Sequence, residues 1–270
     1  MNRRNFIKTG LIFVPSAIAG TVIVPGPLAR HSSLVSSGPP SSGLIAQWES
    51  DAITGLNDGD AVASWPDGSG NSRTATQSSA TLKPLFKTNI FGSKPSVRFD
   101  GSNDLLSFTT TSITNWTFFM VMTVRTYKAF GGALSWRAAS QAGFMFWDTI
   151  GNAAAWVPSI IRTNTSNAEV LSKTKNAAGY GYPTPFPSGP GIICFRYNDT
   201  GPTVYTRRDS QTLATATTDG YTGVPTEGSI GHGYDYLAMD VGAVLVYNTA
   251  LADADVSSVF TYLNGKYTVY

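Results

Sequence analysis

Residues 116–125, with the sequence WTFFMVMTVR, decide the fold class because they are almost continuously apolar. An apolar run of this length is typical of a β-strand that is covered on both faces. The stretch therefore predicts a central strand of a β-sandwich.

Shorter runs on either side of this stretch also indicate strands. Each of these runs is bounded by Gly, Pro, Asn or Asp, and none shows a helical period; they are GALSW, GFMFW, GIICFRY and PTVYTR. Only 13% of the residues are charged, which suits short strands joined by tight turns better than long solvated helices. No segment repeats at a fixed period, so a propeller or solenoid is not expected. The strands favour an all-β domain of two stacked antiparallel sheets.

A hairpin is predicted within residues 94–108, KPSVRFDGSNDLLSF. Val97 and Phe99 alternate with polar neighbours, which is the period of a half-buried strand. The Asp100-Gly101 dipeptide that follows is a frequent turn between antiparallel strands. The two halves of this segment are therefore expected to pair with each other.

One segment departs from the strand pattern. Residues 248–270, NTALADADVSSVFTYLNGKYTVY, place Asp253 and Asp255 where the first turn of a helix would lie, and Asn264-Gly265 can close its end. Apolar residues between these signals recur at helical spacing, so we expect one short helix after the last strand. The expected apolar face consists of Leu251, Val256, Val259, Phe260 and Leu263.

Three segments carry a family resemblance when they are taken together and in order. They are LIAQWESDAITGLNDGDAVASWPDGSGN, KPSVRFDGSNDLLSF and MDVGAVLVYNTALADADVSSVFTYLNGKY. They resemble the start, middle and end of the laminin-G-like jelly-roll domains in the concanavalin A-like lectin and glucanase superfamily, over roughly residues 44–267. The resemblance implies a two-sheet antiparallel jelly-roll sandwich with one short C-terminal helix. Lectins, glycosidases, lyases and adhesion modules all occur in this superfamily, so the fold does not decide the function.

Ala252 departs from the pattern of that superfamily. Its members usually carry Ser or Thr at this position as the N-cap of the helix. Asp253 is the alternative cap, so the start of the helix is left open at this point.

The N-terminus resembles a twin-arginine export signal. Arg3 and Arg4 precede a moderately apolar stretch, and Ala17-Ile18-Ala19 fits the cleavage pattern of a signal peptidase. Prolines interrupt the apolar run, so it is a poor membrane span and we do not expect an integral membrane protein. We expect an exported protein, in the periplasm, outside the cell or on its surface. The alternative is a virion component whose N-terminal arm packs on a neighbour.

These observations divide the chain into three parts. Residues 1–30 form the signal or N-terminal arm, and residues 31–43, HSSLVSSGPPSSG, have the composition of a flexible linker. The jelly-roll domain is expected over residues 44–270.

Charge and cysteine content exclude several classes of function. The chain carries 19 Lys and Arg against 17 Asp and Glu, and four of the basic residues lie within residues 1–30. The remainder is close to neutral and has no run of Lys, Arg and aromatic residues, so nucleic acid is not an expected partner. Cys194 is the only cysteine, which excludes an intrachain disulfide and a cysteine-rich zinc site. Its apolar neighbours indicate a buried hydrophobic side chain rather than a nucleophile.

Residues 65–73, WPDGSGNSR, raise the question of a ligand loop. The third Gly of a dinucleotide fingerprint is missing and no Gly-Lys-Ser or Gly-Lys-Thr follows, which excludes a phosphate loop. We expect Asp67 and Asn71 to cap backbone amides of a turn that Trp65 anchors in the core. The alternative is a structural calcium ion bound by Asp67 and Asn71, since calcium prefers oxygen ligands. The sequence indicates no other cofactor.

The sequence raises two enzymatic interpretations, a glycosidase and a polysaccharide lyase. Retaining glycosidases need two carboxylates close together, but Glu49, Glu169 and Glu227 are isolated in the sequence, so the glycosidase motif is absent. A polysaccharide lyase needs a His or Tyr base, and the candidates are His232, Tyr234 and Tyr236. Ordinary packing of a turn histidine competes with this interpretation.

Aromatic residues in loops are further candidates for ligand binding, because their rings can stack on sugars. Tyr180, Tyr182 and Phe186 lie in a Pro-rich loop, and Trp156 enters another loop. Trp136 ends a strand, where core packing competes with ligand binding.

We therefore expect a non-catalytic recognition or surface-structural module with a glycan as its ligand, or else a neighbouring surface protein as its partner. A decoration or fibre protein of a virion and a lyase that uses His232 are the alternatives. The expected ligand-binding residues are Tyr180, Tyr182, Phe186, Trp156, His232, Tyr234 and Tyr236.

Overall fold

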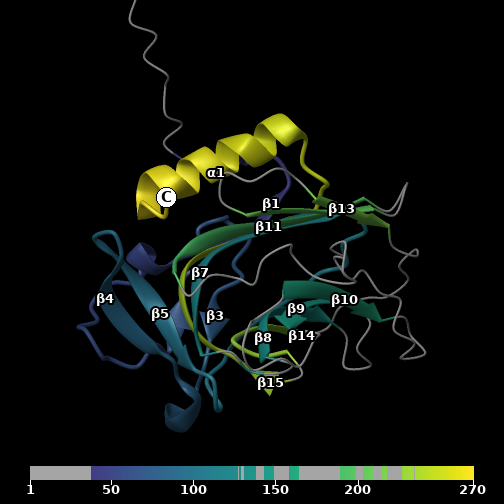
Figure 1. The fold of residues 1–270 in the computed structure, drawn as a ribbon. Coiled ribbons are helices and arrows are strands. Elements are labelled where there is room, and N and C mark those ends of the chain that lie inside the picture. Colours follow the sequence, from purple (N-terminus) through teal and green to yellow (C-terminus); the bar gives the residue numbers. More distant parts are fainter. Residues whose placement is uncertain are drawn as a thin grey trace, which may run out of the picture. The chain divides into compact units, whose positions relative to one another are not determined.

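In a computed structural model, the described part of the chain forms two β-sheets and an α-helix. The structure describes residues 38–126, 128, 131–137, 143–148, 158–163, 189–198, 203–208, 214–217, 227–233 and 235–270. Figure 1 shows the two sheets as stacked layers, with α1 over the layer that contains β1 and β11. The prediction of an all-β sandwich with one C-terminal helix is confirmed for this part of the chain.

The first sheet carries the helix. Its strands are in the order β13-β12-β11-β7-β16-β5-β4, with β1 also paired to β16, and all these pairs are antiparallel. The strands are β1 (Leu44–Glu49), β4 (Leu85–Phe91), β5 (Lys94–Asp100), β7 (Trp116–Thr126), β11 (Gly191–Asn198), β12 (Thr203–Arg208), β13 (Ala214–Thr217) and β16 (Ala238–Tyr247).

The second sheet has the order β10-β9-β8-β14-β6-β3-β2. Its neighbours are antiparallel, except that the short β15 pairs with β8 in parallel. The strands are β2 (Ser64–Trp65), β3 (Ala75–Thr76), β6 (Leu106–Phe108), β8 (Gly131–Arg137), β9 (Gly143–Asp148), β10 (Pro158–Thr163), β14 (Glu227–Ile230) and β15 (Asp235–Tyr236). Two 3-10 turns, η1 (Ser50–Ala52) and η2 (Ala80–Leu82), lie in the connections.

Strand β7 lies between β11 and β16 and is buried on both faces, as the apolar run predicts. Phe118, Met120 and Met122 point into the core between the sheets. Phe119 and Val121 alternate with them and belong to the apolar cluster that includes residues of α1. The continuous apolar run therefore reflects two different covering layers, a sheet on one face and a helix on the other.

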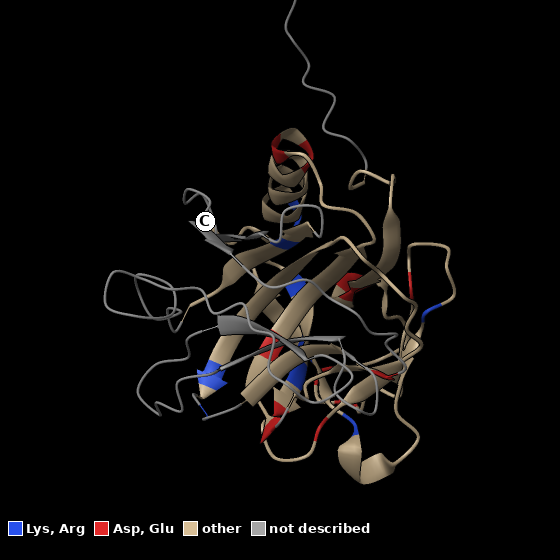
Figure 2. Ribbon diagram, turned by 90° about the vertical axis from the view of Figure 1, so that its right-hand side faces the viewer, with Lys and Arg blue, Asp and Glu red and all other residues tan. Residues whose placement is uncertain are grey.

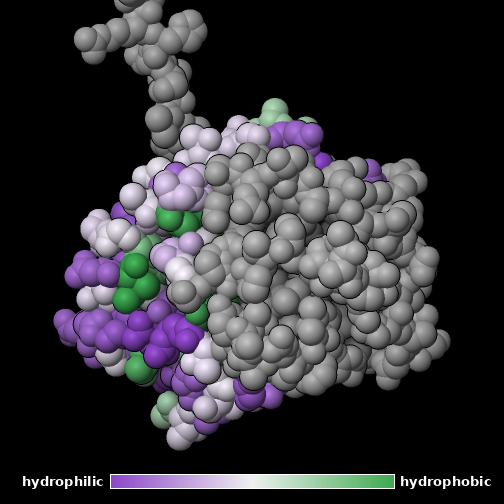
Figure 3. All heavy atoms as spheres, viewed as in Figure 1, coloured by the Kyte–Doolittle hydropathy of each residue, from purple (hydrophilic) through white to green (hydrophobic). Residues whose placement is uncertain are grey.

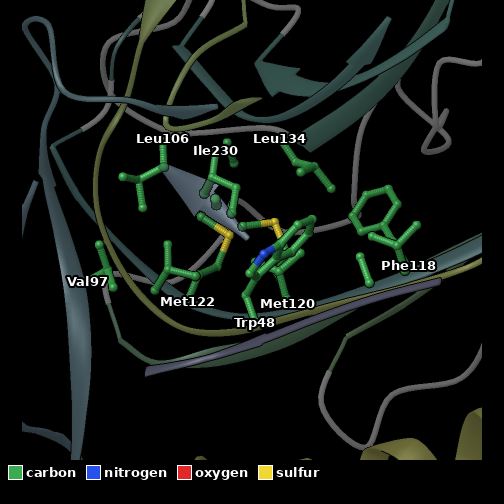
Figure 4. Close-up of a cluster of buried hydrophobic side chains, with 14 of the residues drawn as sticks. Trp48, Val97, Leu106, Phe118, Met120, Met122, Leu134 and Ile230 are labelled. Carbon is green, nitrogen blue, oxygen red and sulfur yellow. The ribbon is translucent and has the colours of Figure 1, made fainter. Parts of the chain in front are cut away.

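The core between the sheets is built from large side chains of both layers. Figure 4 shows Trp48 and Met120 of the first sheet close to Leu106, Leu134 and Ile230 of the second. All five side chains are fully buried. Burial of apolar area on this scale is the main stabilising term of the sandwich.

Helix α1 (Asp253–Tyr267) buries Val256, Val259, Phe260 and Leu263 of the predicted apolar face, whereas Leu251 is buried just before the helix begins. The predicted end at Asn264-Gly265 is wrong, because the helix continues to Tyr267 and Thr268 adopts the left-handed conformation with φ 49°. Asn264 lies within the last turn, and its side-chain oxygen accepts hydrogen bonds from the amides of Val269 and Tyr270, which follow the helix. No helix in the described ranges is long and apolar enough to cross a membrane.

The start of α1 lacks a side-chain cap. Ala252 occupies the N-cap position, and Asp253 is the first helical residue rather than the cap. The buried guanidinium of Arg196 on β11 donates to the carbonyl oxygen of Leu251 and lies 2.7 Å from the Asp253 carboxylate. Arg196 thus joins the start of the helix to the first sheet.

The last turn of α1 is joined to the first sheet by a second charged group. The ammonium of Lys266 lies 2.9 Å from carboxylate oxygens of both Glu49 and Asp51. Burial alone would lower the pKa of Lys266, but the two carboxylates raise it above its ordinary value. The Tyr262 hydroxyl donates to Glu49, and burial together with this contact raises the pKa of Tyr262 to about 12. Both ends of the helix are therefore fixed to the sheet beneath it.

The predicted hairpin within residues 94–108 is wrong. Strand β5 pairs with β4 and β16 in the first sheet, whereas β6 pairs with β14 and β3 in the second. The Asp100 carboxylate accepts hydrogen bonds from the amides of Ser102, Asn103 and Asp104, which shapes a turn that carries the chain between sheets. A Cβ on Gly101 would meet the backbone of Ala238 at 2.6 Å, so the chain passes directly against β16 here.

Cys194 is fully buried on the helix-facing side of β11, which confirms its predicted role as a small hydrophobic side chain. In the described part of the chain, Leu85 and Tyr270 are the exposed large hydrophobic residues. The described surface in Figure 3 is largely hydrophilic, with a few hydrophobic residues between polar ones. Figure 2 shows Lys and Arg interspersed with Asp and Glu along the described ribbon.

Candidate functional site

The turn formed by residues 65–73 covers one edge of β1. The Asp67 carboxylate accepts a hydrogen bond from the amide of Gln47 at 2.9 Å, and the amide of Gly68 donates to the Gln47 carbonyl at 2.7 Å. The Asn71 amide group and the Arg73 guanidinium donate to the carbonyl oxygens of the first two residues of β1. An unpaired strand edge can pair with another chain, and these contacts occupy it.

Asp67 also shapes the turn itself. Its carboxylate accepts hydrogen bonds from the Ser69 amide and hydroxyl and from the Arg73 amide, each at 2.9 Å. Trp65, two residues before it in the chain, is fully buried. In the described residues, no group of three or more His, Cys, Asp or Glu side chains is placed to hold a metal ion. The calcium site at Asp67 and Asn71 stays a prediction, and any such ion would compete with four hydrogen-bond donors for the Asp67 oxygens.

A pocket of about 350 Å³ opens on the second sheet, where β6, β14 and β8 lie side by side. Ser107, Ser229 and Ser135 are aligned in register across these three strands. Cross-strand partners lie on the same face of a sheet, so the three serines form one row. The pocket is lined by Leu105, Ser107, Phe108, Ser135, Glu227, Gly228, Ser229 and His232.

His232 forms one wall of this pocket. The hydroxyls of Ser135 and Ser229 donate to its backbone carbonyl at 2.8 and 3.2 Å, and its ring packs on Tyr236 with 4.6 Å between ring centroids. The preceding Gly231 has φ 94°, and a Cβ there would lie 2.4 Å from the Phe99 ring. Position 231 therefore requires glycine, and the turn that places His232 is fixed against the core.

The turn after His232 is held by an ion pair. The Lys128 ammonium donates to the Asp235 carboxylate at 2.9 Å and to the Gly101 carbonyl at 3.1 Å. Burial alone would raise the pKa of Asp235, but Lys128 and the Tyr236 amide bring it below its ordinary value. A charged Asp235 therefore keeps Tyr236 and the His232 ring in place.

Glu227 contributes the carboxylate of the pocket, and sequence reasoning did not single it out as a ligand-binding residue. It is exposed, and no hydrogen bond or ion pair to another described residue holds its carboxylate. Arg137 on β8 is its cross-strand partner in the backbone register. A lone Glu carries no motif, and only the pairing of β14 with β8 places it beside the serines.

The structure brings together His232 and Tyr236 among the predicted ligand-binding residues. Trp136 is fully buried in the core, so it belongs to packing rather than to a binding surface. Five of the predicted ligand-binding residues lie outside the described residues. They are Tyr180, Tyr182, Phe186, Trp156 and Tyr234.

Comparison with known proteins gives similarity in structure alone. No protein-family model matches the chain, and no curated protein sequence matches it. Among solved structures, the binding domain of botulinum neurotoxin serotype D has a TM-score of 0.57 at 8% identity, with 82% of this chain and 51% of that chain covered. The Trypanosoma rangeli sialidase has a TM-score of 0.52 at 13% identity, with 84% and 33% covered.

A third structure matches over nearly its whole length. Domain 4 of AbnA, an extracellular arabinanase from Geobacillus stearothermophilus, has a TM-score of 0.53 at 12% identity, with 81% of this chain and 98% of that chain covered. By contrast, this chain spans about half the length of the botulinum binding domain and a third of the sialidase. At such identities the matches establish the β-sandwich fold, and the site must be argued from its own residues.

Proposed function

We propose that this protein is a non-catalytic glycan-binding module and that the pocket on β6, β14 and β8 holds the sugar. The observation that carries the proposal is the row of three serine positions at a pocket that also offers a carboxylate and an imidazole. Hydroxyl and imidazole groups can donate to and accept from sugar hydroxyls, and a carboxylate accepts from them. A small number of such groups in a concave surface is the usual composition of a small-molecule site.

The structural neighbours support this proposal through the ligands in their names. The AbnA domain was solved in complex with arabinotriose, and a T. rangeli sialidase structure contains sialic acid. A second botulinum binding domain was solved in complex with SialylT. Those ligands belong to those proteins, and here they favour a carbohydrate over other small molecules.

The pocket favours binding over lyase chemistry. A lyase needs a base next to cationic or amide groups that neutralise a uronate. His232 supplies an imidazole, but no Lys, Arg or Gln side chain occurs among the described residues that line the pocket. The alternative of a virion surface protein rests on the N-terminal arm, which lies outside the described residues.

The proposal is tested by screening the full-length protein on an array of neutral and acidic glycans. Ser107 is exposed, so Ser107→Trp fills the pocket without disturbing the core. The control is Thr126→Trp, at an exposed position on β7 of the other sheet. We expect binding to fall at least about tenfold in Ser107→Trp and to remain unchanged in the control.

Two results would overturn the proposal. One is the absence of binding to every glycan on the array, and the other is unchanged binding by a folded Ser107→Trp variant. Release of unsaturated products from an acidic polysaccharide, lost in His232→Ala, would establish the lyase instead.

A further inference from the structure

The serine row of the pocket continues beyond it along the second sheet. Thr76 on β3 is the register partner of Ser107, and Ser64 on β2 is the register partner of Thr76. Five neighbouring strands thus each place a hydroxyl residue at the same level. In order across β2, β3, β6, β14 and β8 the residues are Ser64, Thr76, Ser107, Ser229 and Ser135.

This hydroxyl row lies on the face of the sheet that points away from the core. Successive side chains of a strand point to opposite faces. The residues that alternate with the row are part of the core between the sheets: Trp65, Ala75, Phe108, Ile230 and Trp136. The row therefore belongs to the opposite face.

One end of the hydroxyl row is open and the other is enclosed. Ser64, Thr76 and Ser107 are exposed, Ser229 is half-buried and Ser135 is 1% exposed. The row thus runs over an open surface from β2 to β6 and descends into the pocket at β14 and β8.

The open part of the row has unused hydrogen-bonding capacity. Among the described residues, no side-chain hydrogen bond is formed by Ser64, Thr76 or Ser107, in contrast to Ser229 and Ser135. Each free hydroxyl offers one donor and two acceptor lone pairs. A single line of such groups, one on each strand, matches a ligand that presents hydroxyls at regular intervals.

The charges near the hydroxyl row favour a neutral ligand. None of its five residues is charged, and Glu227 is the charged residue among the described residues that line the pocket. An acidic chain would bring its charges close to the Glu227 carboxylate, and no Lys or Arg is among the described residues that line the pocket.

We propose that the hydroxyl row binds an extended, neutral polysaccharide chain that crosses the strands, with one end of the bound segment in the pocket. Neighbouring strands are ~4.8 Å apart, so the five positions span roughly 19 Å. That length accommodates several consecutive sugar rings and exceeds the size of one terminal sugar. The inference rests on the proposed glycan-binding function and adds the chemistry, length and direction of the ligand.

The test measures how affinity depends on ligand length. Titration calorimetry uses the full-length protein with xylo-, cello-, manno- and arabino-oligosaccharides from disaccharide to hexasaccharide. For the series that binds, we expect affinity to rise over at least three added sugars. Thr76→Val removes one exposed hydroxyl at constant shape, and we expect about fivefold weaker binding of the hexasaccharide with little change for the disaccharide.

The controls separate the two proposals. Ser64→Ala repeats the test at the far end of the row, and Thr126→Val makes the same chemical change on the other sheet. If a disaccharide binds as tightly as the hexasaccharide, or if Thr76→Val and Ser64→Ala bind the hexasaccharide normally, the extended-chain inference is wrong while glycan binding stands. If no glycan binds, both proposals fail.

Discussion

At the scale of single residues, Asp67 links the turn of residues 65–73 to the edge of β1. Asp67→Ala leaves the amides of Gln47, Ser69 and Arg73 without their acceptor. Because these groups are partly buried, we expect the free energy of unfolding to fall by about 1–3 kcal/mol. Urea denaturation of the variant and the wild type, each with and without a chelator, measures the change.

The chelator distinguishes the two interpretations of this turn. The hydrogen-bonded turn is supported if the chelator leaves the stability of the wild type unchanged and the Asp67→Ala variant is less stable. A wild type that the chelator destabilises supports the calcium site. If Asp67→Ala is as stable as the wild type, both the hydrogen-bonded turn and the calcium site are wrong.

Asp104 gives stability a dependence on pH. Burial, with a smaller contribution from the nearby Asp100 charge, raises the pKa of Asp104 to about 6 in the folded protein, against an ordinary value of 3.8. The folded state therefore binds the proton more tightly than the unfolded state. The resulting stabilisation is fully present below about pH 4 and is lost as the pH rises through about 6.

The comparison of wild type with Asp104→Asn isolates this group, since the other carboxylates titrate in both proteins. We expect the melting temperature of the wild type, relative to the variant, to rise when the pH is lowered from about 7 to about 5. An equal response of both proteins would show that Asp104 titrates normally.

The predictability of these residues differs for physical reasons. Asp67 sits among glycines and small polar residues, and its preference for turns is local, so its hydrogen bonds to the Ser69 and Arg73 amides could be anticipated. The prediction for Asn71 is wrong, because its side chain donates to the distant Leu44 carbonyl instead of accepting from an amide of the turn. The hydroxyl row could not be anticipated, because β2 and β3 are two residues long, which is too short to show a strand period in the sequence. Its members become neighbours only through strand pairing over long distances in sequence.

At the scale of the elements, α1 begins without a side-chain acceptor for its first amides. The N-cap Ala252 is exposed and has φ −64° and ψ 156°, the extended conformation that a capping residue adopts. Serine at this position can accept a hydrogen bond from an amide of the first turn. We expect Ala252→Ser to stabilise the protein by about 1 kcal/mol in chemical denaturation.

The matched control is Ala254→Ser, two residues further along, at an exposed position inside the helix. Serine has a lower helix propensity than alanine there, so we expect this variant to be slightly destabilised. If both variants change stability by the same amount, the effect does not come from capping.

The outcome for β5 and β6 shows where local patterns stop being informative. The alternation of Val97 and Phe99 gave the correct buried face for β5. The Asp-Gly signal gave the correct turn, but the partner of the next strand depends on distant segments. By contrast, β7 and α1 were predicted well because the apolar pattern of each is long and lies within one continuous segment of the sequence.

At the scale of the whole molecule, the resemblance of three separated segments was sufficient for the two-layer architecture. It could not supply the site, because domains of this architecture place ligand-binding residues differently. The residues of the site come together only through the register of strand pairing in the second sheet.

Export of the protein is a proposal at this scale, based on the arginine pair at the N-terminus. Replacing Arg3 and Arg4 with Lys preserves charge but alters the pair that the export machinery recognises. We expect the double variant to accumulate in the cytoplasm, as measured by cell fractionation with a periplasmic marker. Equal export of the two proteins would contradict the proposal.

The position of β16 in the first sheet has a consequence for synthesis on the ribosome. This strand pairs with β1, β5 and β7, yet it is translated after all three of them. Until residues 238–247 emerge, the nascent chain holds β1 and β7 without the strand that joins them. Because these contacts are distant in sequence, the first sheet cannot be completed before β16 emerges, and until then the apolar β7 stays exposed to aggregation. Ribosomes stalled before β16 should therefore carry chains that depend on a chaperone to remain soluble.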